Sequence, residues 1–287
     1  MYYTKFPHID QLLRYTFVDK DVRGELVQLS NSYRRFFLGR AYPRAVNRML
    51  GELMAATSLL TATLKFEGHI SLQIHGDGPV NFITVNGNHK QELRGLARVR
   101  DEVSEDLSTV KELLGPNALL VITITPERGE RYQGVVAAEG DTIASLIEAY
   151  FNKSEQLRTR IWLFADGEFA SGIMLQVLPA AGTSDDDFDH LVHLTDTITE
   201  HEIYVLSGEE ILHRLYHQEK LELYPPQRVR FKCTCSRKNT LNALASVSPE
   251  ELEEILLADS VITMTCDYCN KKYQFTEPEL REELLRR

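Results

Sequence analysis

Residues 69–99, HISLQIHGDGPVNFITVNGNHKQELRGLARV, contain three runs in which apolar and polar side chains alternate. The runs are separated by residues 76–79 (GDGP) and 86–88 (NGN), and such clusters of glycine, proline and asparagine are typical of turns between strands. Alternation with a period of two indicates strands that bury one face. The segment therefore predicts an antiparallel meander of three strands.

The segments around this meander predict further helices and strands. Residues 43–64 carry apolar side chains at helical spacing and begin with Pro43, which suits a first helical turn. After the meander we expect a short helix at 106–114, strands at 118–125 and 130–138, a helix capped by Asp141 or Thr142, and a hairpin across Asp166 and Gly167. Residues 1–178 are thus expected to form a mixed α and β core domain with antiparallel sheets and crossing helices, of the α+β class.

The composition changes at residue 179. Residues 180–190 (AAGTSDDDFDH) are small and acidic, which indicates a surface connection. Residues 179–232 carry 11 acidic and 5 basic side chains, a net charge of −6, whereas residues 1–178 carry 21 acidic and 20 basic side chains. Short amphipathic helices follow, one of them with Ser207 and Glu210 spaced as a capping box. Because such helices are marginal in isolation, we predict a metastable, acidic helical linker at 179–232.

Two histidines of this linker, His213 and His217, stand one helical turn apart. They could clasp a metal ion, but the glutamate of an HExxH motif and nearby cysteines are both missing. A solvated helix face is the favoured interpretation.

All four cysteines lie in the last 55 residues, at Cys233, Cys235, Cys266 and Cys269. In a reducing cytoplasm such a cluster indicates metal binding or redox chemistry rather than permanent disulfides. The CDYC pair lies between two strand-like runs, so we expect it at the tip of a hairpin, followed by Asn270 at a position of positive φ. In extended backbone Cys233 and Cys235 point to one side.

Four thiolates complete a tetrahedral shell, which favours one zinc ion per chain, with iron as the alternative. The sequence therefore predicts a small zinc-binding domain at 233–287. About 55 residues bury little core, so the metal is expected to supply most of this domain's stability. Bound thiolates are open to oxidants, and oxidation would eject the zinc.

Other classes of function find little support. A net charge of −10 argues against a general nucleic-acid binder. The N-terminus lacks the layout of a secretion signal, and no apolar run is long enough for a membrane helix, so we expect a cytoplasmic protein with no membrane partner. Gly-rich phosphate loops, GxSxG and HExxH are missing, so no catalytic residue is proposed and the protein is not expected to be an enzyme.

Two alternatives use the same cysteines. One is a zinc ribbon that binds nucleic acid through Arg237, Lys238, Lys271 and Lys272, although these charges would equally balance a tetrathiolate zinc site of charge −2. The other is a thiol–disulfide oxidoreductase that uses CDYC, although such motifs normally open a helix beside a βαβ unit.

The chain resembles the family of 33 kDa redox-regulated heat-shock chaperonins along nearly its whole length. The most specific matches are CTCS at 233–236 and CDYC at 266–269. Supporting stretches are HGDGP, RGLARV, ITITP, ERYQGVV, YFNKSEQL and LQVLP. The chain departs from the family pattern at Arg158, at Lys238–Asn239 and at Asn270, where proline, an arginine–glutamate pair and glycine are usual, and none of these positions is a cysteine.

This resemblance implies an ATP-independent chaperone, a holdase, that is inactive when reduced and zinc-bound. Under oxidative stress Cys233 would form a disulfide with Cys235, and Cys266 with Cys269, with release of zinc and unfolding of the C-terminal domain. The linker would then loosen and capture unfolding client proteins, while the chaperone forms a homodimer and later passes clients to ATP-driven chaperones. Whether Leu212, Leu215 and Tyr216 belong to this client surface or are permanent core contacts stays open at the level of sequence.

Overall fold

The computed structural model describes residues 10–100, 103–104, 106–178, 185–244, 247–248, 253, 255 and 261–280. The chain divides into two compact units, Met1–Phe231 and Lys232–Arg287. The three-part division at residues 178 and 232 that the sequence suggests stays a prediction, because compactness does not test which part unfolds on its own.

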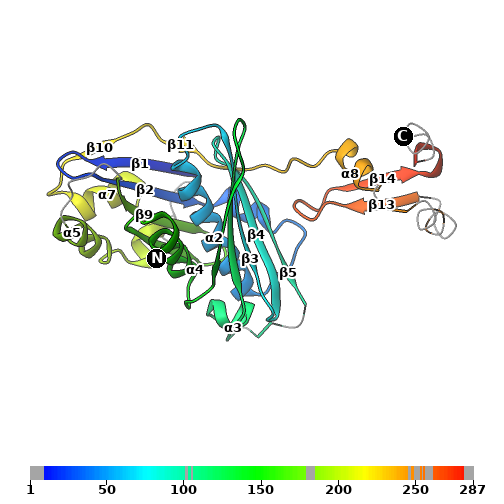
Figure 1. Ribbon diagram of the computed structural model, residues 1–287, viewed down its shortest axis with the longest axis horizontal. Helices are drawn as coiled ribbons and strands as arrows, with labels where there is room; N and C mark the ends of the chain where they lie inside the picture. The colour runs from blue at the N-terminus through cyan, green and yellow to red at the C-terminus, as the bar shows by residue number, and fades with distance from the viewer. Residues whose placement is uncertain are drawn as a thin grey trace, which may run out of the picture. The chain divides into compact units, whose positions relative to one another are not determined.

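The first sheet of unit 1 has the strand order β10-β1-β2-β9-β8, and β11 also pairs with β1 (Figure 1). Its strands are β1 (Gln11–Phe17), β2 (Val22–Leu29), β8 (Thr159–Ala165), β9 (Ala170–Val177), β10 (Leu221–Leu223) and β11 (Gln227–Arg228). The hairpin expected across Asp166 and Gly167 is confirmed as β8–β9, with Gly167 at φ 100°. The sheet therefore combines strands of the core domain with two short strands from the predicted linker.

The second sheet has the order β12-β5-β4-β3-β6-β7. Its strands are β3 (Gly68–His75), β4 (Val80–Asn88), β5 (Glu92–Val99), β6 (Leu119–Pro126), β7 (Tyr132–Ala137) and β12 (Arg230–Phe231). The meander predicted at 69–99 is confirmed as β3–β4–β5, with the first turn at residues 76–79 as expected. The second turn was placed too early: residues 86–88 still pair within β4, and the chain turns at residues 89–91. Only β12 runs parallel to its neighbour, β5, among the described pairs of this sheet.

Helix α2 (Arg44–Ala62) lies between the two sheets and contacts strands of both (Figure 1). Its side chains are buried on nearly all sides, so the helix predicted at 43–64 is confirmed as the centre of the main core. Pro43 stands one position earlier than expected, at the N-cap. The shorter helices of this region are α1 (Asn31–Phe36), α3 (Val110–Leu114), α4 (Ile143–Tyr150) and a π-helical turn, η1 (Phe151–Glu155).

Three helices from the predicted linker cover the other face of the first sheet: α5 (Asp185–Thr195), α6 (Glu200–Val205) and α7 (Gly208–Tyr216). Leu212, Leu215 and Tyr216 are buried there in a second apolar cluster, in which the Tyr216 ring packs 5.1 Å from that of Phe17. The capping box of Ser207 at the start of α7 is confirmed. In this structure the apolar faces of the linker helices are therefore core contacts.

Unit 2 contains α8 (Arg237–Leu244) and a hairpin of β13 (Val261–Thr265) and β14 (Lys272–Thr276). Its apolar core consists of only five buried side chains among the described residues, Leu244, Ile262, Tyr273, Phe275 and Leu280. Within the described part of the chain, no helix combines the length and the apolar character needed to cross a membrane.

Candidate metal centre

The second cysteine pair lies at the tip of the β13–β14 hairpin, as predicted. The strands pair from Val261↔Thr276 to Thr265↔Lys272, and the chain turns through Cys266 and Cys269 between them. The turn is closed by backbone hydrogen bonds, because Cys266 N–H donates to Lys271 O at 3.0 Å and Asn270 N–H donates to Cys266 O at 2.9 Å. Asn270 has φ 56°, the positive value expected for it.

The first pair lies just before α8. Cys233 and Cys235 belong to no strand or helix, and Ser236 after them accepts a hydrogen bond from Asn239 N–H at 3.1 Å through its hydroxyl. That bond satisfies one of the free amide groups at the start of α8 and fixes where the helix begins. Cys235 itself packs against the small apolar core of unit 2.

The four sulfur atoms converge, all within 4.8 Å of one another. Cys233 Sγ lies 3.7 Å from Cys266 Sγ, and Cys235 Sγ lies 3.4 Å from Cys269 Sγ. Four sulfurs at about 2.3 Å from a tetrahedral zinc ion would lie about 3.8 Å apart. The donor set and its spacing therefore fit a tetrahedral metal with soft ligands.

The thiols do not all ionise readily without a cation. Burial raises the pKa of the Cys233 thiol to about 12 and also raises that of Cys269. Burial acts upward on Cys235 too, but hydrogen bonds from the Tyr273 hydroxyl, 3.2 Å away, and from the other cysteines bring its pKa down to about 7. Four thiolates at these distances repel one another, so the fully ionised cluster requires a bound positive charge.

Comparison with known proteins agrees with this geometry. A family model described as "Hsp33 protein" matches residues 10–276. The chain belongs to the Hsp33 family. Relatives named 33 kDa chaperonin, from Shewanella oneidensis and Yersinia pestis, are 52% identical over 266 residues and 51% identical over 271 residues, and each match covers 93% of this chain and 92% of the relative.

The fold of the Hsp33 family is also found in a solved structure. The crystal structure of a 33 kDa chaperonin (heat shock protein 33 homolog) from Thermotoga maritima is similar, with a TM-score of 0.80. The match covers 96% of this chain and 98% of that chain at 19% identity, so it concerns the fold alone. The family names support a chaperone role and imply one other than catalysis.

Membership of the Hsp33 family does not by itself identify the metal or its ligands. The four cysteines are brought together and could hold a metal ion. Their assignment as zinc ligands, and as two disulfide pairs, stays a prediction. The Tyr273 hydroxyl beside Cys235 was not foreseen, since only the pairing of β13 with β14 brings residue 273 next to the cluster.

A second group of possible ligands, Glu67, His89 and Glu127, lies in unit 1. His89 Nδ1 accepts a hydrogen bond from Gly68 N–H at 3.1 Å, so its lone pair is engaged. The neutral ring then carries its proton on Nε2, which lies 3.8 Å from a Glu67 carboxylate oxygen. Neither ring nitrogen offers a free lone pair, so these residues are a poor metal site.

The histidines and basic side chains considered in the sequence also have defined positions. His213 and His217 are exposed, in agreement with a solvated face of α7. Arg237 pairs with Glu279 at 2.6 Å and donates to Gln274 O at 2.7 Å, and Lys271 lies 5.2 Å from the centre of the Tyr273 ring. Two of the four candidate phosphate contacts are therefore engaged within unit 2, which weakens the nucleic-acid alternative.

Proposed function

We propose that the protein is a cytoplasmic, redox-regulated, ATP-independent holdase whose off state depends on one zinc ion held by Cys233, Cys235, Cys266 and Cys269. The observation that carries the proposal is the convergence of four sulfurs within 4.8 Å in a unit whose described residues include five buried apolar side chains. Bound there, zinc would supply the charge that allows four thiolates to lie together, and its binding would add about 10–16 kcal/mol to folding, the range found in small zinc peptides.

Oxidation would act on the sulfurs directly. Each disulfide takes two electrons from two thiolates, and one hydrogen peroxide molecule accepts them with two protons to give two water molecules. We assign the disulfides to Cys233 with Cys235 and to Cys266 with Cys269. These partners are close in sequence and stay close once the hairpin opens, whereas pairing across the two segments must close a much longer loop.

The short disulfides also suit a reversible switch. A disulfide between cysteines two residues apart, such as Cys233 and Cys235, is near the limit of normal Cα separations. Such a bond is strained and is therefore readily reduced by a thiol. Reduction would restore the four thiolates and with them the site for zinc.

The structure of the linker supports the next step, in which residues 179–232 loosen when the domain at 233–287 unfolds. Strand β12 ends at Phe231, two residues before Cys233, so the end of the linker is joined directly to the segment that loses its fold. Loosening would expose Leu212, Leu215 and Tyr216 and the sheet face beneath them. These apolar surfaces are the proposed binding surface for unfolding client proteins.

The proposed partners follow from this mechanism. Unfolding client proteins bind the exposed surface, the oxidised chain forms a homodimer, and clients pass later to ATP-driven chaperones. Neither nucleic acid nor a membrane is a proposed partner.

A light-scattering assay on a heat-denatured client tests the proposal. Reduced, zinc-loaded protein should leave aggregation unchanged, whereas protein treated with peroxide at mild heat should suppress aggregation and contain no zinc. Equal suppression by both forms, or suppression by oxidised protein that keeps its zinc, would refute the proposed switch.

A further inference from the structure

A short segment at the end of the linker, residues 227–231, joins the two sheets of unit 1, and we call it the strap. Its first part, β11, pairs with β1 of the first sheet, and its last part, β12, pairs with β5 of the second. Between them, Val229 N–H donates to Asp10 O at 2.9 Å and Ser32 Oγ donates to Val229 O at 3.3 Å. The strap is therefore bound on both sides.

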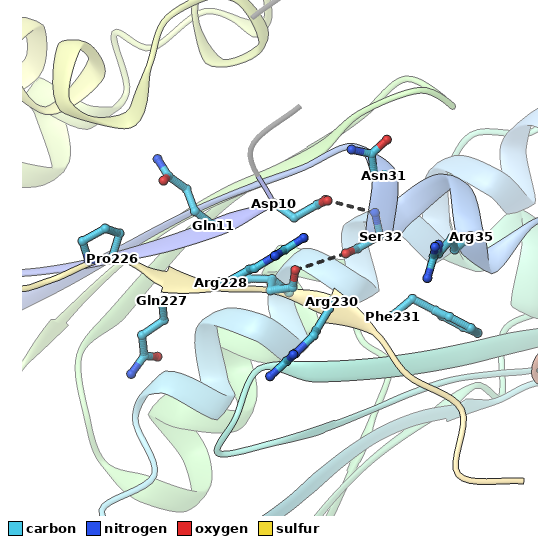
Figure 2. A pocket seen from close by; sticks show the side chains of 11 residues that line it. Asp10, Gln11, Asn31, Ser32, Arg35, Pro226, Gln227, Arg228, Arg230 and Phe231 are labelled. Carbon is cyan, nitrogen blue, oxygen red and sulfur yellow. Dashed lines mark hydrogen bonds between the residues drawn. The ribbon is translucent and has the colours of Figure 1, made fainter. Parts of the chain in front are cut away.

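A cavity of about 670 Å³ lies between the strap, the start of β1 and α1. Figure 2 shows Arg228, Arg230 and Phe231 on the strap side and Ser32 and Arg35 on the α1 side. The cavity is within the usual size range of sites for small molecules. A ligand in the cavity would therefore meet guanidinium groups and an aromatic ring.

The cavity is basic in an acidic protein. Among the described residues that line it are three arginines, Arg35, Arg228 and Arg230, against one acidic residue, Asp10. Asp10 Oδ1 already accepts hydrogen bonds from Ser30 N–H at 2.8 Å and Ser32 N–H at 3.0 Å. Arg230 lies 3.8 Å from Glu92, whereas neither Arg35 nor Arg228 forms an ion pair with any residue that the structure describes.

The sequence concentrates this charge at the strap. Residues 179–232 contain five basic side chains against eleven acidic ones, and three of the five stand in the last five positions. Guanidinium groups on two facing elements match an anion with several oxygens, since each group donates in a planar fork. Phosphate groups are the anions that this geometry suits best.

We propose that this cavity binds a small molecule with a diphosphate group, held between Arg35 of α1 and Arg228 of the strap. The ring of Phe231, which packs 5.4 Å from that of Phe36, provides an apolar wall for the rest of the ligand. A bound diphosphate links the strap to α1 and so opposes release of the linker. The site lies wholly within unit 1 and is formed while the linker is docked, so binding is measured on the reduced, zinc-loaded protein and its failure would leave the proposed zinc switch untouched.

Calorimetric titration of the reduced, zinc-loaded full-length protein tests the proposal, with inorganic pyrophosphate in one arm and ADP in the other. Binding in either arm is expected, and the arm identifies whether the diphosphate is free or carried by a nucleoside. The double variant Arg35→Gln/Arg228→Gln should weaken binding about tenfold for each arginine removed. The matched control is Arg128→Gln/Arg131→Gln, which removes two exposed charges between β6 and β7 and should leave binding unchanged.

A second readout follows the strap itself. Hydrogen exchange at the Val229 and Arg230 amides, which donate to Asp10 O and Gln91 O, should slow about tenfold at a ligand concentration ten times the dissociation constant. Zinc content is measured after each titration, because diphosphates also chelate zinc. Absence of binding in both arms, or equal binding by the arginine variant and the control, would overturn the proposal.

Discussion

At the scale of single residues, the cysteine cluster depends on each of its four members. Removing one sulfur leaves three ligands and lowers the charge that the cluster offers to a cation. The five buried apolar side chains in the described part of unit 2 cannot compensate for a loss on the order of the 10–16 kcal/mol measured for zinc peptides. Each cysteine should therefore be needed both for metal and for the fold of the hairpin.

The variant Cys266→Ser tests this dependence. We expect its zinc content to fall from one ion per chain to nearly none, and the amide resonances of β13 and β14 to collapse toward unfolded values. Metal analysis after gel filtration and NMR spectra measure the two effects. The control is Thr265→Ser, at the neighbouring position on β13, which should keep both the bound zinc and the folded hairpin. A folded Cys266→Ser protein with bound zinc would contradict the proposed site.

A buried carboxyl group in unit 1 predicts a pH dependence. Burial raises the pKa of Glu25 from 4.5 to about 7, although Arg23 and Arg14 act in the opposite direction. Folding therefore favours the protonated form, so the contribution of Glu25 to stability is complete below pH 4.5 and is lost as the pH rises through 7. The loss amounts to about 3 kcal/mol by pH 8.

Denaturant unfolding of Glu25→Gln at pH 5 and pH 8 measures this effect. The variant should be more stable than the parent protein at pH 8, and the difference should shrink at pH 5, because the amide stays neutral at both. The exposed Glu130→Gln control should show no such pH-dependent gain. A gain of equal size at both pH values would show that the charge of Glu25 is not the cause.

At the scale of elements, the linker helices are held on the first sheet by an apolar cluster of side chains from both. Leu215 on α7 is 3% exposed within the apolar cluster that also contains Phe17 and Tyr15. The single tryptophan of the chain, Trp162 on β8, donates to Asp196 after α5 at 2.8 Å. Its fluorescence should therefore report whether the linker is docked.

Leu215→Ala should loosen the linker without oxidation. Truncation of a buried leucine costs about 2–5 kcal/mol, so we expect a shift in Trp162 fluorescence and partial suppression of client aggregation by the reduced protein. His213→Ala alters an exposed position of the same helix and should change neither. If Leu215→Ala releases the linker but gives no chaperone activity, the covered surface is not where clients bind.

The elements also show which parts of the fold the sequence could predict. Strands β3–β5 were predicted because one face of each is more exposed, which produces alternation. Strands β1 and β2 were not predicted. Helix α2 covers one face of their sheet and helices α5–α7 cover the other face, so adjacent residues such as Leu12 and Leu13 are both buried and the sequence does not alternate. Strands β10–β12 have two or three residues each, too few to show any periodicity.

At the scale of the whole molecule, the candidate metal site was easier to predict than the surfaces around it. Metal binding restricts residue type and spacing within a short segment, so the cysteines stand out in the sequence. The arginine-lined cavity combines residues from positions 10–35 and 226–231, which only the folded chain brings together. The burial of α5–α7 on the first sheet likewise depends on partners far away in the sequence, such as Gln28, whose side-chain amide donates to Ile203 O and Leu206 O, 175 and 178 residues away.

At the same scale, the proposed switch requires that unit 2 and the linker unfold together while the rest of unit 1 stays folded. Hydrogen exchange of the full chain, before and after peroxide treatment at mild heat with zinc release followed in parallel, tests this most directly. We predict that β13, β14 and α5–α7 lose protection as zinc is released, while α2 and β3–β6 keep it. Retained protection of β13 and β14 in the oxidised, zinc-free protein would contradict the account.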